Sequence, residues 1–304
     1  MELIPNAENN IPFQLRESSL KSSAISAALT RSNRMLFSAL GISCRWKKCV
    51  EKEAGVICGA EKSQEWLLPW WWSRYREHNA FPVTFVDFGM SEGMKSWCRE
   101  RGELCLVELK HFCISSRDSI DPNLIKEWES IYGQTMWNSR PTWFKKPFAL
   151  LNSSYERAIW IDLDCEVLGS LDPLFLLLDA GTELALVREY TSDHLPRFDP
   201  NVRYNGGVVV FQHGARIIEK WAEGAIDKNH LFAGDDSLLS HLIHQHLLDV
   251  IELPEIYNWR MARGLNLNAV ILHWIGNSGK AYIRKYGGLK PSLEAVQKLE
   301  KHAF

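Results

Sequence analysis

The sequence predicts an α/β fold whose central sheet is mostly parallel and flanked by helices. From residue 54 onward, apolar β-forming runs alternate with runs of helical periodicity. Strands that alternate with helices pair in parallel through right-handed crossovers. We expect strands at 55–60, 83–88, 104–109, 159–164, 183–188, 204–211 and 269–275, and helices at 61–78, 91–101, 143–152, 215–226 and from 234 onward.

Length and composition fit one large α/β domain, which we place at residues 51–304. The chain has 304 residues, of which 46% are hydrophobic and 24% are charged, so disorder throughout is excluded. A formal net charge of −2 gives no attraction to nucleic acid. Residues 111–141 show no clear periodicity and are expected to form an irregular excursion.

Cysteine usage and hydropathy bear on the compartment. Seven cysteines without paired Cys-x-x-Cys spacing favour reduced thiols and a cytoplasmic protein, although a secreted effector stays open. No apolar run approaches the roughly 18 residues that span a bilayer. We therefore expect no transmembrane segment.

The first 50 residues form a basic, serine-rich extension. Between residues 18 and 50 the sequence contains no carboxylate, and its charged residues are Lys21, Arg31, Arg34, Arg45, Lys47 and Lys48. A targeting signal, an arm that contacts anionic surfaces and a helical extension packed on the main domain all remain open.

The central motif is the sequence IWIDLD at residues 159–164. Alternation along a strand places Asp162 and Asp164 on the same side, with Cα atoms about 6.5 Å apart. Two such carboxylates repel one another unless a cation lies beside them, and hard divalent ions accept carboxylate ligands. The motif predicts a metal site, while a simple turn at the end of the strand is the alternative.

Several other polar groups lie where strands begin or end. Asn205 precedes the glycine pair Gly206 and Gly207, which lets the backbone approach a bound group or form a turn. Asp235 and Asp236 open a helix and can cap it. His273 interrupts an apolar strand and is either a core residue or a third metal ligand. Residues 276–280 are expected to form a loop that ends in a cation.

Further candidates follow from sheet topology, because ligands of parallel sheets collect at the carboxyl ends of the strands. Ala60, Glu61 and Lys62 follow the first strand, and Asp87 closes the second. Lys145 and Lys146 precede the central strand and reach either a phosphate or solvent.

The order of these motifs resembles that of GT-A glycosyltransferases of family 8, from about residue 56 to residue 280. IWIDLD is similar to the family's metal-binding Asp-x-Asp strand, NGGVVVF to its Asn-Ala/Gly-Gly strand, GDDSLL to its Asp-Gln helix opening, and HWIGNSGK to its closing His-x-x-Gly-x-x-Lys. The resemblance implies a Rossmann-like fold for nucleotide-diphospho-sugars. It also implies transfer of a hexose from a nucleotide-sugar, usually UDP-linked, to a glycan, lipid or protein acceptor with retention of configuration.

Site roles are carried over residue by residue. The resemblance implies Mn²⁺, or Mg²⁺, held by Asp162, Asp164 and His273. It implies catalytic or acceptor-orienting roles for Asp235, Asp236 and Asn205. It assigns donor binding to Ala60, Glu61, Lys62, Asp87, Lys145, Lys146, Asp162, Leu163, Gly206, Gly207, Gly276 and Lys280.

Two departures from the family pattern keep alternatives open. Asp236 stands where the family has Gln, and Lys280 lies one residue later than the family spacing. A haloacid-dehalogenase-like phosphatase with Asp162 as nucleophile and Asp164 as acid/base beside Mg²⁺ is one rival. A domain that binds nucleotide-sugar or glycan without turnover is another.

Overall fold

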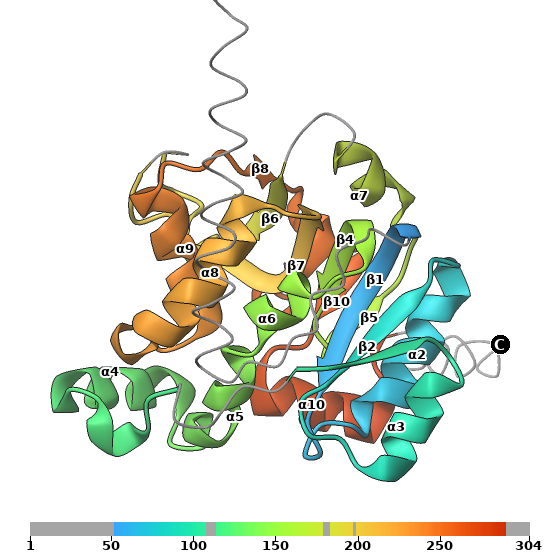
Figure 1. Cartoon of the computed structure of the whole chain (residues 1–304), viewed down its shortest axis with the longest axis horizontal. Helices are drawn as coiled ribbons and strands as arrows, with labels where there is room; N and C mark the ends of the chain where they lie inside the picture. The colour runs from blue at the N-terminus through green and yellow to red at the C-terminus, as the bar shows by residue number, and fades with distance from the viewer. Residues whose placement is uncertain (1–51, 108–113, 179–182, 197–198, 290–304) are drawn as a thin grey trace, which may run out of the picture. The chain divides into compact units, whose positions relative to one another are not determined.

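The computed structural model describes residues 52–107, 114–178, 183–196 and 199–289, and the expected extension over residues 1–50 lies outside this part. Within it, seven strands form one sheet in the order β3-β2-β1-β4-β7-β6-β8 (Figure 1). These strands are β1 (Lys52–Ala60), β2 (Val83–Asp87), β3 (Glu103–Leu106), β4 (Tyr155–Ile161), β6 (Leu184–Arg188), β7 (Tyr204–Gln212) and β8 (Ile251–Glu252).

The sheet is mostly parallel, which confirms the predicted fold class. β3, β2, β1 and β4 pair in parallel, and β8 pairs in parallel with β6. β7 runs antiparallel to both of its neighbours, β4 and β6. The N-terminal end of β7 therefore lies at the same edge of the sheet as the carboxyl ends of β1 and β4.

A second, three-stranded sheet extends this edge. It consists of β5 (Cys165–Val167), β10 (Ile271–His273) and β9 (Trp259–Arg260), with β10 in the middle. His273 is paired with Cys165 on one side and with Arg260 on the other. Because β5 follows β4 after three residues, this small sheet lies directly beyond the end of the central strand.

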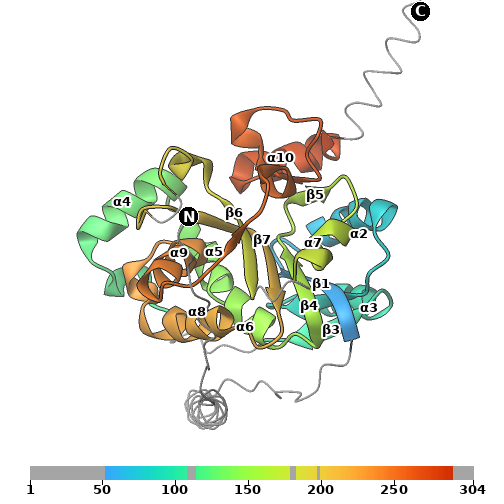
Figure 2. The same ribbon diagram turned by 90° about the horizontal axis from the view of Figure 1, so that it is seen from above.

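Helices cover both faces of the large sheet (Figure 2). α2 and α7 lie on one face, and α6 and α8 lie on the other, where α8 also packs against α9. The described helices are α2 (Leu67–His78), α3 (Glu92–Arg99), α4 (Pro122–Tyr132), α5 (Met136–Trp143), α6 (Lys146–Leu151), α7 (Asp172–Leu177), α8 (Arg216–Asp227), α9 (Asp235–Gln245) and α10 (Gly276–Tyr286). None of them is long and apolar enough to cross a membrane.

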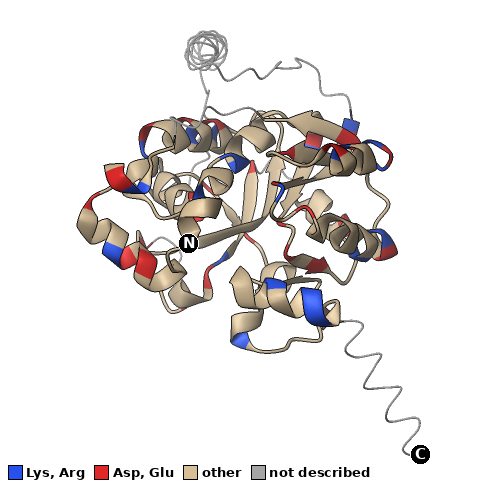
Figure 3. Ribbon diagram, turned by 90° about the horizontal axis from the view of Figure 1, so that it is seen from below, with Lys and Arg blue, Asp and Glu red and all other residues tan. Residues whose placement is uncertain are grey.

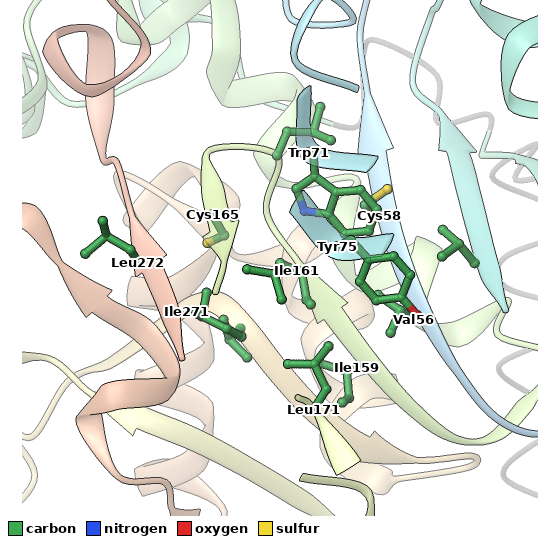
Figure 4. Packing of buried hydrophobic residues seen from close by; sticks show 14 of the residues in the cluster. Val56, Cys58, Trp71, Tyr75, Ile159, Ile161, Cys165, Leu171, Ile271 and Leu272 are labelled. Atoms are coloured by element: carbon green, nitrogen blue, oxygen red, sulfur yellow. The ribbon is translucent and has the colours of Figure 1, made fainter. Parts of the chain in front are cut away.

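Period-two alternation explains the main core. Val56 and Cys58 of β1 face α2, where the rings of Trp71 and Tyr75 stack with centroids 5.2 Å apart (Figure 4). Ile161 of β4 faces the same layer and belongs to the same buried cluster as β5 and β10. The core therefore fixes the end of β4 against the small sheet, where the metal motif was expected.

Two segments that were expected to be irregular are helical. Residues 114–141 are largely helical rather than irregular, because Asp121 accepts a hydrogen bond from the Asn123 amide at 2.7 Å and caps α4 ahead of a proline. Residues 276–280 are the first turns of α10 rather than a loop. This helix carries Lys280, Arg284 and Lys285 and no acidic residue, as the blue segments near the C-terminus show (Figure 3).

Candidate active site

A cleft of about 790 Å³ opens at the edge where β1 and β4 end and β7 begins. Such edges are where open α/β sheets bind ligands. One wall comes from the segment after β1, a second from α4 and α5, and a third from α9 and α10. The candidate residues in its lining are Glu61, Lys146, Asp162, Leu163, Asp164, Asn205, Gly207, Asp235, Asp236, His273, Gly276 and Lys280.

The two aspartates of the central motif lie in a turn rather than on a strand. β4 ends at Ile161, and the amide of Cys165 closes the turn by donating to the Asp162 carbonyl at 3.0 Å. The two aspartates therefore do not occupy strand positions, although both residues line the same cleft. Instead, the two carboxylates contact different partners.

Asp162 is held from the α6 side. Its Oδ1 accepts a hydrogen bond from the indole of Trp160 at 2.6 Å and lies 3.2 Å from Lys146 Nζ. Its backbone amide donates to the carbonyl of Gly207 at 2.8 Å, which ties the turn to β7. A quarter of its side chain, 26%, remains exposed in the cleft.

Asp164 is held from the opposite side. Its Oδ1 lies 3.3 Å from His273 Nε2, and its Oδ2 accepts a hydrogen bond from Lys280 Nζ at 2.6 Å. Burial acts to raise the pKa of Asp164, but Lys280 and His273 outweigh it and hold the pKa well below its usual range. Asp164 therefore remains ionised, as a metal ligand must.

Asp164, Cys165 and His273 present ligand atoms within 4.8 Å of one another. The thiol of Cys165 contacts the Gly207 carbonyl at 3.8 Å, and burial, with Asp164 and Asp162 nearby, raises its pKa well above the usual range. Because the thiolate is the ligating form, Asp164 and His273 are the candidate ligand pair of this group.

A buried lysine organises the other half of the cleft. Lys146 Nζ lies 3.0 Å from Asp235 Oδ2 and donates to the Gly206 carbonyl at 3.0 Å. Burial raises the pKa of Asp235 to about 7, since the neighbouring Asp236 and Asp162 add to the effect and Lys146 only partly opposes it. Burial also raises the pKa of Asp236. Asp235 can therefore exchange a proton near neutral pH.

Behind these groups runs a chain of buried amides. His273 Nδ1 lies 2.9 Å from Asn258 Oδ1, and the Asn258 amide donates to Asn205 Oδ1 at 2.7 Å. Asn205 in turn donates to Glu189 at 2.8 Å. The predicted residue Asn205 thus reaches the candidate metal ligand through a side chain that sequence analysis did not identify.

Five predicted donor-binding residues are not part of the cleft lining: Ala60, Lys62, Asp87, Lys145 and Gly206. Asp87 instead accepts hydrogen bonds from the Gly89 and Met90 amides at 2.8 and 2.6 Å and pairs with Lys95 at 3.0 Å. Its carboxylate therefore stabilises the turn after β2.

Sequence analysis did not identify several residues of the site. Tyr132 and Trp143 form the α4–α5 wall, with ring centroids 6.2 Å apart. Tyr132 falls within the segment that was expected to be irregular, and Trp143 opens the helix that was expected at 143–152. Asn258 lies in a short 3₁₀ turn before β9, and only the pairing of β9 with β10 brings it to His273. A capping analysis of residues 121–132 would have found α4, which carries Tyr132.

The donor set fits a divalent cation. A carboxylate and an imidazole face one another in a cleft that holds a second carboxylate, and such oxygen and nitrogen groups suit Mn²⁺ or Mg²⁺. The His273 ring also contacts a second group through its other nitrogen, as metal-ligating histidines usually do.

No protein-family model matches the sequence, and no curated protein does. Among solved structures, the chain is similar to the galactosyltransferase LgtC in complex with donor and acceptor sugar analogues, at 12% identity and a TM-score of 0.49, over 78% of this chain and 96% of that one. It is also similar to the glycosyltransferase GlyE of Streptococcus pneumoniae TIGR4 (17% identity, TM-score 0.48, 83% and 64% covered) and to mouse xyloside xylosyltransferase 1 (15%, 0.46, 73% and 97%).

All three similar proteins are glycosyltransferases, the class that the sequence motifs resemble. At TM-scores below 0.5, the similarity is limited to the general path of the backbone. The function is therefore argued from this chain's own residues.

Proposed function

We propose that this chain is a metal-dependent glycosyltransferase that moves a hexose from a nucleotide-diphosphate sugar, with UDP as the nucleotide, to an acceptor hydroxyl with retention of configuration. One observation carries the proposal. A single cleft brings a carboxylate–imidazole pair, two lysines and a protonatable aspartate to the edge of an α/β sheet.

The charges suit a diphosphate leaving group. Asp164 and His273, with Asp162 nearby, would hold a divalent cation, which would supply positive charge against the negative charge that develops on the diphosphate. Lys280 adds a fixed positive charge beside the same carboxylate. Preorganised charges of this kind stabilise a transition state without reorganisation of solvent.

The start of α9 suits an acceptor. Asp235, whose pKa lies near 7, and its neighbour Asp236 border the cleft next to the α4–α5 wall. A carboxyl group that exchanges a proton near neutral pH can orient an acceptor hydroxyl by hydrogen bonding. Asp236 offers a carboxylate where the resembled family has an amide.

The phosphatase alternative requires Asp162 as the attacking group. In the structure this carboxylate accepts a hydrogen bond from Trp160 and contacts Lys146, and both interactions lower its nucleophilicity. A domain that only binds nucleotide-sugar does not need Asp162 as a nucleophile. The presence of turnover distinguishes the proposed enzyme from such a domain.

The test measures release of free nucleotide from UDP-, GDP- and ADP-sugars with Mn²⁺, beside a generic phosphatase substrate with Mg²⁺. We expect release from one UDP-sugar by the wild type and its loss in Asp164→Ala, with Asp227→Ala on the exposed end of α8 as a matched control. Phosphatase turnover without donor hydrolysis would overturn the proposal, and so would donor binding without turnover.

A further inference from the structure

The hydrogen bonds behind His273 run through four side chains in a fixed direction. Glu189 Oε1 accepts from Asn205 Nδ2, Asn205 Oδ1 accepts from Asn258 Nδ2, and Asn258 Oδ1 lies against His273 Nδ1, at 2.8, 2.7 and 2.9 Å. Asn205, Asn258 and His273 are 5%, 2% and 5% exposed, so water does not compete for these groups.

The direction of this chain of hydrogen bonds follows from groups that can only donate or only accept. An ionised Glu189 can only accept, so the Asn205 group that faces it is the NH₂ donor. The backbone amide of Gly207 can only donate, and it donates to Asn205 Oδ1 at 2.9 Å. These two contacts fix the orientation of Asn205 from both ends.

The orientation of Asn205 determines the next two groups. Because its Oδ1 accepts, Asn258 must present its NH₂ to Asn205 and its carbonyl oxygen to His273. A carbonyl oxygen accepts a hydrogen bond, so His273 Nδ1 must carry the proton. In the neutral ring this leaves Nε2 with a lone pair, and Nε2 is the atom that faces Asp164 at 3.3 Å.

We propose that Glu189, Asn205 and Asn258 are positioning residues that hold the proton of the neutral His273 ring on Nδ1, so that Nε2 of the neutral ring is the nitrogen left for a divalent cation. Arg260 pairs with the other oxygen of Glu189 and keeps the start of the chain a carboxylate. The metal-binding part of this inference rests on the proposed function, whereas the tautomer follows from the hydrogen bonds themselves.

The tautomer is directly measurable. Long-range ¹H–¹⁵N correlation spectra of the full-length, metal-free protein with ¹⁵N-labelled histidine separate the two tautomers, at a pH high enough to remove the second ring proton. The His273 signal is the one that disappears in His273→Gln. We expect the Nδ1–H pattern in the wild type, and an Nε2–H pattern overturns the proposal whatever the protein catalyses.

Variants of Asn258 test the cause. Asn258→Leu removes the acceptor, so we expect His273 to shift to the Nε2–H form and donate to Asp164. Mn²⁺ affinity, measured by the electron paramagnetic resonance signal of the free ion, should fall about 10–100-fold, the usual cost of losing a group that orients a ligand. Asn258→Asp keeps an acceptor at the ring and should retain the Nδ1–H tautomer.

A second buried asparagine controls for general loss of stability. Asn229 is 1% exposed and donates to carbonyls at the end of α8, away from the cleft lining. Asn229→Leu should lower the melting temperature without changing the tautomer. An Asn258→Leu variant that folds and keeps the Nδ1–H form would refute the positioning role. A correct tautomer without Mn²⁺ binding in the wild type would refute the proposed metal chemistry and leave the tautomer assignment intact.

Discussion

Lys280 donates to Asp164 Oδ2 across 2.6 Å, while Oδ1 of the same carboxylate faces His273. A metal ion at Asp164 therefore shares its ligand with a lysine from α10. Under the proposed function, the Lys280 ammonium group competes with the metal ion for Asp164 and also binds the phosphates of the donor. Lys280 should therefore weaken metal binding and strengthen donor binding, and the two effects can be measured separately.

Replacing Lys280 should strengthen metal binding and weaken nucleotide binding. A hydrogen bond to a charged group contributes about 1.5–3 kcal/mol, which is roughly tenfold or more in a binding constant. We expect Lys280→Gln to bind Mn²⁺ about tenfold more tightly in the absence of nucleotide, and UDP about tenfold more weakly in its presence. Isothermal titration calorimetry of each ligand checks both signs, and Lys220→Gln on α8 serves as the surface control. Equal weakening of both ligands contradicts the interpretation.

The two glycines of the Asn-Gly-Gly motif should respond differently to alanine. A Cβ at Gly207 would come within 2.6 Å of His273 Nδ1, whereas a Cβ at Gly206 would meet Lys146 Nζ at 3.4 Å and Asp236 Cβ at 3.5 Å. Gly207→Ala must therefore displace the imidazole, and we expect at least a tenfold loss of Mn²⁺ affinity, of the order found when a ligand loses its orienting contacts. Gly206→Ala should bind Mn²⁺ nearly as the wild type does. Similar losses of Mn²⁺ affinity in both variants would show that the motif acts through its backbone rather than through the space it leaves beside His273.

Removal of Lys146 alone should destabilise the fold more than removal of Lys146 together with one of its carboxylate partners. Lys146→Met leaves Asp162 and Asp235 without their buried counter-ion, and breaking a buried pair costs about 3–5 kcal/mol. Without Lys146 the pKa of Asp235, already near 7, rises further and this carboxyl takes up a proton, so Asp162 is the carboxylate left without a partner. Adding Asp162→Asn removes that charge, and the double variant should recover part of the loss. Urea unfolding of the wild type, both single variants and the double variant gives the interaction free energy. Strict additivity would mean that the two residues are not coupled.

Asp87 should make stability fall in acid. Burial acts to raise the pKa of Asp87, but hydrogen bonds from Met90 and Gly89 and the pairing with Lys95 hold the pKa below its ordinary value. A carboxyl group whose pKa is depressed by folding stabilises the native state above its unfolded pKa, about 3.9, and loses that contribution as the pH falls through the folded pKa. We expect Asp87→Asn to be less stable than the wild type at pH 7, with the difference shrinking below about pH 4. A pH-independent difference between the two unfolding curves would exclude this linkage.

The parts of the molecule that sequence reasoning predicted are those with a strong local pattern. β2, β6 and β7 are apolar runs bounded by polar residues, and they lie where the periodicity placed them, whereas β4 begins and ends earlier than the predicted 159–164. The helix α5 contains Pro141, which interrupts its pattern, and this explains why the segment seemed irregular.

The candidate site was predicted in part for the same reason. The motifs containing Asp164 and His273 identified two groups that the fold does bring together, because each motif lies on or directly beside a buried strand. The different partners of Asp162 and Asp164 depend on a three-residue turn, and the role of Asn258 depends on pairing between β9 and β10. Neither relationship has a signature within one segment of sequence.

The separation of the site residues along the chain has a consequence for biosynthesis. Asp164 and Lys280 meet across 116 residues, and the strand that carries His273 pairs with β5 only after the whole of β7, α8 and α9 has been made. Because a ribosome delivers the chain from its N-terminus, the large sheet, whose last strand ends at Glu252, can form while the cleft still lacks its imidazole and its lysine. A nascent chain is therefore unable to assemble the complete site, and catalytic competence would mark the end of folding rather than an early stage of it.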